Sequence, residues 1–242
     1  MFILITRQQE KSEEFSALLN KNKIKNLCFP VLIIKRNNPT ATNIDNLKES
    51  NFVIFTSQNS VSNFMKIFTK DNLIGKKIAS IGDSTSKALE EFGVEVDISP
   101  ENEFSSENLC KEISNLPNKN NKIIIVKGEG GRSILRDELS KKFQVYDDLN
   151  IYKRELPGEI HNIDKPTFEK ISHICITSVE ILKNLITICD LSNLQISKHM
   201  IFVSGNQRIA NEIKKIFPNN KILISKNPTN EDMLSTILNK SN

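Results

Sequence analysis

Residues 52–57 read Phe-Val-Ile-Phe-Thr-Ser, four apolar residues followed by two hydroxyl residues, and a helical pattern begins at Ser60. Four consecutive apolar residues are typical of a strand buried on both faces, and Ser or Thr commonly caps a helix. The unit predicted here is therefore a buried strand that runs directly into a helix.

The same unit recurs along the whole chain. Short apolar runs alternate with amphipathic stretches of about ten residues, a pattern that predicts parallel sheets with helices on both faces. The expected strands are Phe2–Ile5, Ile24–Phe29, Val31–Lys35, Phe52–Phe55, Ile78–Ile81, Val94–Ile98, Lys122–Val126, Gln144–Asp147, His173–Ile176, Met200–Val203 and Ile222–Ile224. The expected helices are Glu10–Leu19, Ser60–Phe68, Ser84–Phe92, Ser105–Ile113, Ser133–Phe143, Val179–Cys189, Gln207–Phe217 and Glu231–Asn239.

A long internal repeat predicts two domains. Residues 52–57 resemble 173–178, 78–82 resemble 201–205, and 105–109 resemble 229–233, each about 120 positions later. That spacing is one domain's length and too long for a solenoid repeat. The residues leave two divisions open. A sequential one joins 1–121 and 122–242. An interleaved one joins 1–33 with 157–242, inserts 37–148, and leaves 34–36 and 149–156 as paired linker strands.

Composition narrows the class of protein. The chain has 242 residues with 33 Lys and Arg against 29 Asp and Glu, a net charge of +4, and no dense basic block. This favours a small anionic ligand over nucleic acid. The four cysteines and three histidines show no metal-site spacing, and no apolar run is long enough to span a membrane. We expect a cytoplasmic monomer that uses no metal.

Candidate site residues follow the expected strands, where open parallel sheets bind ligands. The strand-to-helix junctions are rich in Ser, Thr, Asn and Gly, which helix capping alone explains. Capping does not explain the cations at these junctions, because a positive charge near a helix N-terminus opposes the helix dipole. We therefore expect an anionic ligand at the junctions. The cations are Arg7, Lys127, Arg132 and Arg208, and the polar candidates are Ser57, Gln58, Asn59, Ser84, Thr85, Ser178 and Gln207.

Other chemistry is scarce. The glycines of 127–132 fit neither a P-loop nor a dinucleotide fingerprint. Asp147 and Asp148 are interpreted as a solvated strand end. Tyr152, in the expected linker, is either a ring packed on an exposed ribbon or a proton donor at the floor of a cleft between the domains.

The order of these motifs resembles the uroporphyrinogen-III synthase family over the whole chain. The resemblance rests on Ile5-Thr6-Arg7, Phe55-Thr56-Ser57, Ile81-Gly82-Asp83-Ser84-Thr85, Ser105-Ser106-Glu107-Asn108-Leu109, the Gly-Glu turn of 126–132 and Ile151-Tyr152-Lys153-Arg154. The second half departs from the family. Val179-Glu180 stands where Ser-Pro is frequent, and Gly205-Asn206-Gln207-Arg208 stands where Gly-x-Thr-Thr is frequent.

The resemblance implies two α/β domains with flavodoxin-like lobes, joined by a two-stranded β linker in the interleaved division. It implies a lyase of haem biosynthesis that needs no cofactor and cyclises hydroxymethylbilane, inverting its last ring through a spiro intermediate. Tyr152 would be the catalytic residue, and the junction residues with Arg7, Lys127 and Arg132 would bind substrate. A transient contact with the preceding pathway enzyme is also expected. The alternatives are a non-catalytic bilobal binding or sensor protein for a small anion and a nucleotide-dependent transferase.

Overall fold

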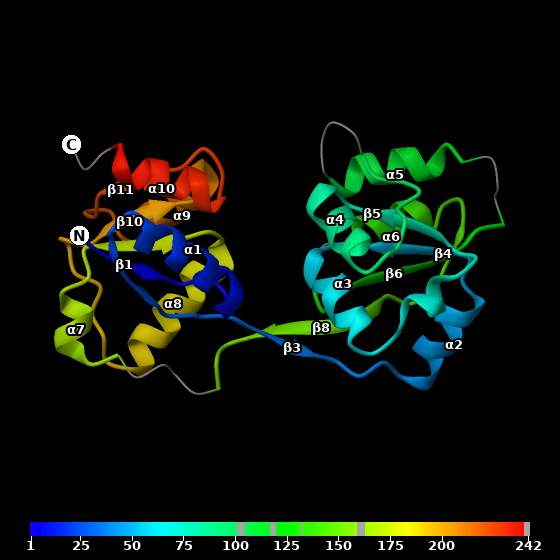
Figure 1. Cartoon of the computed structure of the whole chain (residues 1–242), viewed down its shortest axis with the longest axis horizontal. Coiled ribbons are helices and arrows are strands. Elements are labelled where there is room, and N and C mark those ends of the chain that lie inside the picture. The colour runs from blue at the N-terminus through cyan, green and yellow to red at the C-terminus, as the bar shows by residue number, and fades with distance from the viewer. Residues whose placement is uncertain (101–104, 117–119, 132, 159–162, 240–242) are drawn as a thin grey trace. The chain divides into compact units, whose positions relative to one another are not determined.

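The structure is a computed structural model that describes residues 1–100, 105–116, 120–131, 133–158 and 163–239. It divides into two compact units, shown in Figure 1. Unit 1 comprises Met1–Ile33 and Glu155–Asn242, and unit 2 comprises Ile34–Arg154. The chain therefore passes from one unit to the other twice, and unit 2 is continuous in sequence.

Unit 1 is built on a five-stranded sheet in the order β11-β10-β9-β1-β2, and all four strand pairings are parallel. Counted along the chain within the unit, this is the strand order of flavodoxin-like folds. The strands are β1 (Phe2–Ile5), β2 (Lys25–Cys28), β9 (His173–Ile176), β10 (Ile201–Ser204) and β11 (Ile222–Ile224). The helices are α1 (Gln9–Lys21), α7 (Lys165–Glu169), α8 (Val179–Leu191), α9 (Gln207–Ile216) and α10 (Asn230–Leu238).

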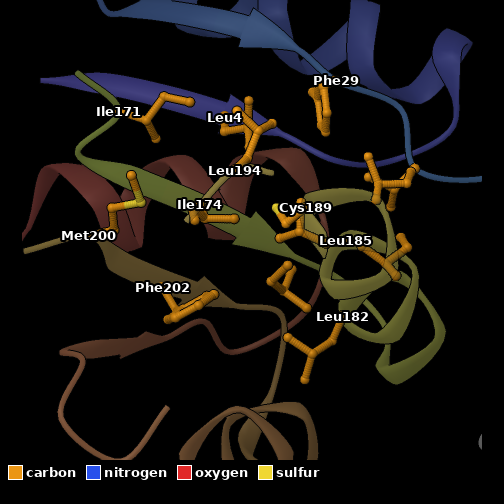
Figure 2. Close-up of a cluster of buried hydrophobic side chains, with 14 of the residues drawn as sticks. Leu4, Phe29, Ile171, Ile174, Leu182, Leu185, Cys189, Leu194, Met200 and Phe202 are labelled. Carbon is orange, nitrogen blue, oxygen red and sulfur yellow. The ribbon is translucent and has the colours of Figure 1, made fainter. Parts of the chain in front are cut away.

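Alternate side chains of β1 face opposite layers of helices, because successive residues of a strand point to opposite faces. Phe2 and Leu4 belong to a cluster with Phe29 and the buried residues of α8 and α9, part of which Figure 2 shows. Ile3 and Ile5 belong to a second cluster with buried residues of α1 and α10. Both faces of the sheet are therefore covered, which explains why β1 is apolar at every position.

Unit 2 contains a sheet in the order β3-β8-β6-β4-β5, with β7 also paired to β6. The pairings of β4 with β5, and of β6 with β4, β7 and β8, are parallel. The strands are β3 (Ile33–Arg36), β4 (Phe52–Phe55), β5 (Lys77–Ser80), β6 (Lys122–Gly128), β7 (Gln144–Val145) and β8 (Leu149–Glu155). The helices are α2 (Ala41–Glu49), α3 (Gln58–Met65), α4 (Asp83–Glu91), α5 (Ser106–Ser114), α6 (Ile134–Leu139) and the 3-10 helix η1 (Lys70–Leu73).

The helices of unit 2 also cover both faces of its sheet. Val53 and Phe55 pack in one cluster with buried residues of α2, α3 and α4. Phe52 and Ile54 pack in another with buried residues of α5 and α6. The chain therefore leaves β4 towards one face and leaves β6 towards the other. The expected architecture of parallel sheets between helices is confirmed.

Several expectations about single elements differ from the structure, among them the helix expected at Ser133–Phe143, which spans Ile134–Leu139. The strand expected at Val94–Ile98 is reduced to one parallel bridge between Ala79 and Ile98. The linker strand expected at 149–156 is also a sheet strand of unit 2, because Leu149, Asn150 and Tyr152 pair with β6. β3 lies beside β8, and the Asn37 N–H donates to the Ile151 carbonyl at 3.0 Å.

Candidate active site

A pocket opens in unit 2 at the carboxyl ends of β4 and β6. These strands are parallel neighbours, and their following helices pack on opposite faces, which creates a crevice at this point of a parallel sheet. The pocket has a volume of about 180 Å³. Its polar and charged side chains are Thr56, Ser57, Ser106, Lys127, Ser133, Arg136, Asp148, Tyr152 and Arg154, and Gly128, Gly130 and Gly131 contribute backbone.

Tyr152 of β8 reaches this pocket from within the sheet. Its side chain is only 2% exposed, so the interpretation of a ring on an exposed ribbon is wrong. Its hydroxyl lies 3.1 Å from the Ser57 hydroxyl and accepts a 3.3 Å hydrogen bond from Arg154 Nη2. The Arg154 guanidinium also lies 5.5 Å from the ring centroid. The phenol is thus fixed by two neighbours in the wall of the pocket.

Gly128 makes room for this phenol. A Cβ atom on Gly128 would lie 2.5 Å from Tyr152 Cζ and 2.9 Å from its hydroxyl oxygen, closer than real Cβ contacts allow. The register of β6 against β8 shifts between Lys127 and Gly128, which places Gly128 opposite Tyr152. A glycine is needed where the ring crosses the neighbouring strand so closely.

Ser57 both caps α3 and contacts Tyr152. Its hydroxyl accepts from the Ser60 N–H at 3.1 Å, while the Ser60 hydroxyl accepts from the Ser57 N–H at 3.0 Å. This reciprocal capping satisfies two N–H groups at the helix start. Capping and contact with Tyr152 are therefore simultaneous roles of one side chain.

A second cluster in the pocket is ionic. The Asp148 carboxylate lies 3.0 Å from Arg136 Nη2 and 3.5 Å from Lys127 Nζ. Asp148 and Lys127 side chains are each only 15% exposed, so the interpretation of Asp148 as a solvated strand end is wrong, whereas Asp147 is 80% exposed. Burial acts to lower the pKa of Arg136, but hydrogen bonds to Asp147 and Asp148 outweigh it, and the pKa is raised.

In unit 1, Arg7 lies just beyond the carboxyl end of β1, as the pocket of unit 2 lies at the carboxyl ends of β4 and β6. Arg7 is partly buried, and its Nη1 donates to Asn230 Oδ1 at 2.6 Å. Among the residues that the structure describes, no carboxylate forms an ion pair with Arg7. Burial lowers its pKa, and the more distant Glu14 partly opposes this. A partly desolvated arginine at a strand end suits an anionic ligand.

Two other predicted residues of unit 1, Ser178 and Gln207, have local partners, whereas Arg208 is exposed on α9. Ser178 caps α8, because its hydroxyl accepts from the Ile181 N–H at 3.1 Å. Gln207 Nε2 donates to Asn211 Oδ1 at 2.8 Å on an exposed part of α9. Cys175 is fully buried, and desolvation raises its pKa to about 12, so its thiol stays protonated.

The structure thus brings together only part of the predicted set. Ser57, Lys127 and Tyr152 line the pocket, whereas Gln58, Asn59, Ser84 and Thr85 do not. Gln58 and Ser84 are exposed, and Thr85 is buried within α4. Arg132 lies outside the described residues. Arg136, Asp148 and Arg154 line the pocket but were not among the predicted site residues. The signal for Arg154 was its place two residues after Tyr152, on the same face of a strand.

The described residues also lack two other features. No group of three or more His, Cys, Asp or Glu residues there could hold a metal ion. Within the same ranges, no helix has both the length and the apolar character needed to cross a bilayer.

Two solved structures share this fold. The uroporphyrinogen-III synthetase of Helicobacter pylori superposes with a TM-score of 0.66 at 14% identity, over 98% of each chain. A mutant uroporphyrinogen III synthase of Thermus thermophilus gives 0.60, also at 14% identity, over 99% of this chain and 98% of that one.

Sequence comparisons give the family. A Methanocaldococcus jannaschii protein, provisionally named uroporphyrinogen-III synthase, is 31% identical over 245 residues, 98% of each chain. The porphyrin biosynthesis protein HemD of Ruminiclostridium josui is 23% identical over 246 residues, which cover 98% of this chain and 48% of that one. The family model described as uroporphyrinogen-III synthase HemD matches residues 13–235. With a match across more than nine-tenths of its length, this chain belongs to the uroporphyrinogen-III synthase family.

Proposed function

We propose that this protein converts hydroxymethylbilane into uroporphyrinogen III as a cyclising lyase of tetrapyrrole biosynthesis. The observation that carries the proposal is Tyr152. Its hydroxyl is buried in the wall of a pocket, close to the Ser57 hydroxyl and the Arg154 guanidinium. Family membership supports the reaction class, and the pocket supplies a proton donor beside cations.

The reaction loses one water molecule. The substrate's hydroxymethyl oxygen takes a proton and the C–O bond breaks, so that water leaves and a protonated azafulvene cation remains. The substituted carbon of the last ring then attacks to form a spiro intermediate. Fragmentation and reclosure invert that ring, and loss of a proton restores the pyrrole. We assign the first proton transfer to Tyr152 as general acid.

Control of the product depends on positioning. The linear substrate also closes without an enzyme, to the isomer in which the last ring is not inverted. Suppressing that route a hundredfold requires roughly 2.7 kcal/mol of differential stabilisation. Holding a flexible chain in one geometry can supply this. In the proposal, Lys127 in unit 2 and Arg7 in unit 1 each bind carboxylates of the substrate.

A product-isomer assay tests the proposal. The protein is supplied with hydroxymethylbilane and the type III and type I products are resolved. We expect type III from the wild-type protein. A sample that yields only type I at the spontaneous rate would refute the proposal and favour a non-catalytic binding protein.

Tyr152→Phe tests the catalytic residue. It removes the hydroxyl and keeps the ring against Gly128, so we expect kcat to fall roughly 100-fold with folding intact. Tyr146→Phe is the matched control, because Tyr146 is the other tyrosine of the chain and its hydroxyl bonds to Glu49, away from the pocket. Equal kcat for Tyr152→Phe and the wild type would remove Tyr152 from the mechanism.

A further inference from the structure

The pocket of unit 2 contains a carboxylate where the proposed ligand is itself a polycarboxylate. Asp148 lines the pocket and its side chain is only 15% exposed. An uncompensated negative charge there would repel an anionic ligand strongly, because water screens it poorly. The pocket therefore needs a means of offsetting Asp148.

Arg136 provides that offset with a fixed geometry. Its Nε and Nη2 atoms both lie 3.0 Å from Asp148 Oδ1, closer than Lys127 Nζ, which lies 3.5 Å from Oδ2. Nη1 donates to Asp147 Oδ1 at 2.9 Å, and Nη2 also donates to the Tyr146 carbonyl at 3.0 Å. The whole guanidinium fork is thus anchored on residues 146–148 and holds the carboxylate in one orientation.

We propose that Arg136 is a positioning residue that acts through Asp148: it offsets the Asp148 charge so that the pocket of unit 2 can accept one carboxylate arm of a polycarboxylate. The volume of about 180 Å³ suits one such arm, since pockets for whole small-molecule ligands are larger. This inference rests on the proposed function for the class of substrate. Neither Arg136 nor Asp148 is assigned a covalent step.

The charges predict whether each of two substitutions raises or lowers the Kd. Arg136→Gln leaves Asp148 negative in the pocket wall and should raise the Kd for a polycarboxylate roughly tenfold. Asp148→Asn keeps an acceptor oxygen for Arg136 and removes the negative charge, so the Kd should stay equal or fall. In the double variant the charge to be offset is gone, and the Kd should return to within about threefold of the wild-type value.

The experiment is a fluorescence titration of the full chain with uroporphyrin, a stable macrocycle with eight carboxylates. It compares the wild type, both single variants and the double variant, with folding followed by circular dichroism. Lys141→Gln is the matched control, because it removes one positive charge from an exposed pair with Glu138 near α6. We expect no change in its Kd.

The double variant separates the proposed role from a structural one. If Arg136 merely held the fold, Asp148→Asn would not rescue Arg136→Gln, and a double variant as weak as Arg136→Gln would overturn the inference. An unchanged Kd for Arg136→Gln would overturn it too. If Arg136→Gln does not fold, Asp148→Asn alone decides, because a tenfold weaker Kd for that variant contradicts the inference and an equal or lower Kd supports it.

Failure of this inference and failure of the proposed function are distinguishable. The titration needs no turnover, so the expected pattern of Kd values with only type I product would refute the proposed function alone. Type III product with a Kd that is insensitive to Arg136 would refute the inference alone. A wild-type chain that does not bind uroporphyrin would overturn the inference.

Discussion

Gly128 and Tyr152 lie opposite each other on neighbouring strands of unit 2, and the Tyr152 ring occupies the space that a side chain on Gly128 would need. The glycine is required by contact and not by backbone conformation, because the clash is between a Cβ and the Tyr152 ring. The position of the phenol, and with it any chemistry of Tyr152, therefore depends on a residue that itself carries no functional group.

Gly128→Ala should displace the Tyr152 ring. Because the added Cβ would lie 2.5 Å from Cζ, we expect a loss of about 1–3 kcal/mol in the free energy of unfolding, as for overpacked cores. We also expect a fall in kcat comparable with Tyr152→Phe. Urea denaturation and the isomer assay measure the two effects. Gly158→Ala is the control, since nothing lies within 4 Å of a Cβ there. Wild-type kcat and stability in Gly128→Ala would contradict this account.

At the residue scale the sequence located strand ends better than side-chain partners. Ser57 and Lys127 could be placed near a site because each follows an apolar run, whereas Tyr152 could be placed there through its position in the expected linker and through the family resemblance. Arg136 and Asp148 could not, because their contact depends on how residues 146–148 fold back onto α6, and neither periodicity nor spacing encodes that.

Substitutions of Ser178 can test whether a residue that caps a helix also contacts the substrate. Ser178→Ala removes the cap of α8 and should lower the free energy of unfolding by about 1 kcal/mol. Ser178→Asn and Ser178→Asp both keep a capping oxygen. If this end of α8 meets substrate carboxylates, KM should rise for Asp and not for Asn. Equal KM values for the two variants would show that Ser178 only caps α8.

His173, at the start of β9, should make the free energy of unfolding depend on pH. His173 is 9% exposed, and desolvation lowers its pKa, with smaller contributions from the N-terminus and Lys221. The folded chain thus binds a proton at His173 less readily than the unfolded chain, whose histidines titrate near pH 6.5. The free energy of unfolding should be undiminished by His173 above that pH and fall as the pH drops through it towards the lower folded value.

His173→Asn should flatten that part of the pH dependence. The change is measured by urea denaturation at pH 7.5 and 5.5, with His199→Asn, which removes an exposed histidine, as the control. A slope equal to that of the wild type in His173→Asn would show that the loss at acid pH arises elsewhere.

Among the elements, helices with a clear apolar periodicity were predictable, and helices with few buried residues were not. α2 and α7 were not expected from the sequence. Only Leu47 of α2 is buried, and α2 starts with a reciprocal cap between Thr40 and Asn43, so it carries almost no periodic signal. α7 has five residues, too few for a periodicity to show. Val94–Ile98 has apolar residues typical of a strand but forms only one bridge.

Across the whole molecule, each hydrophobic cluster draws its residues from a single unit. Residues 34–154 contain all but the first residue of β3 and the last residue of β8, with helices on both faces of the sheet, in one continuous segment. The apolar repeat alone left the sequential and interleaved divisions open, because strands of the same pattern can pair with more than one neighbour.

Residues 34–154, expressed alone, should fold. We expect a cooperative thermal transition by circular dichroism and dispersed amide resonances by NMR. Residues 155–242 are the matched comparison and should not fold, because β9 there would lack its partner β1 and the apolar residues of β1 and α1. An unfolded 34–154 segment would show that unit 2 depends on the rest of the chain.

The pairing of β1 with β9 has a consequence for synthesis on the ribosome. β1 is made before β9, and the register partner of Ile3 is His173, which is made about 170 residues later. At typical elongation rates the wait is on the order of 10 to 30 s. During that interval the nascent Phe-Ile-Leu-Ile segment lacks the partner that covers one of its edges, and such an open apolar edge can pair with other chains.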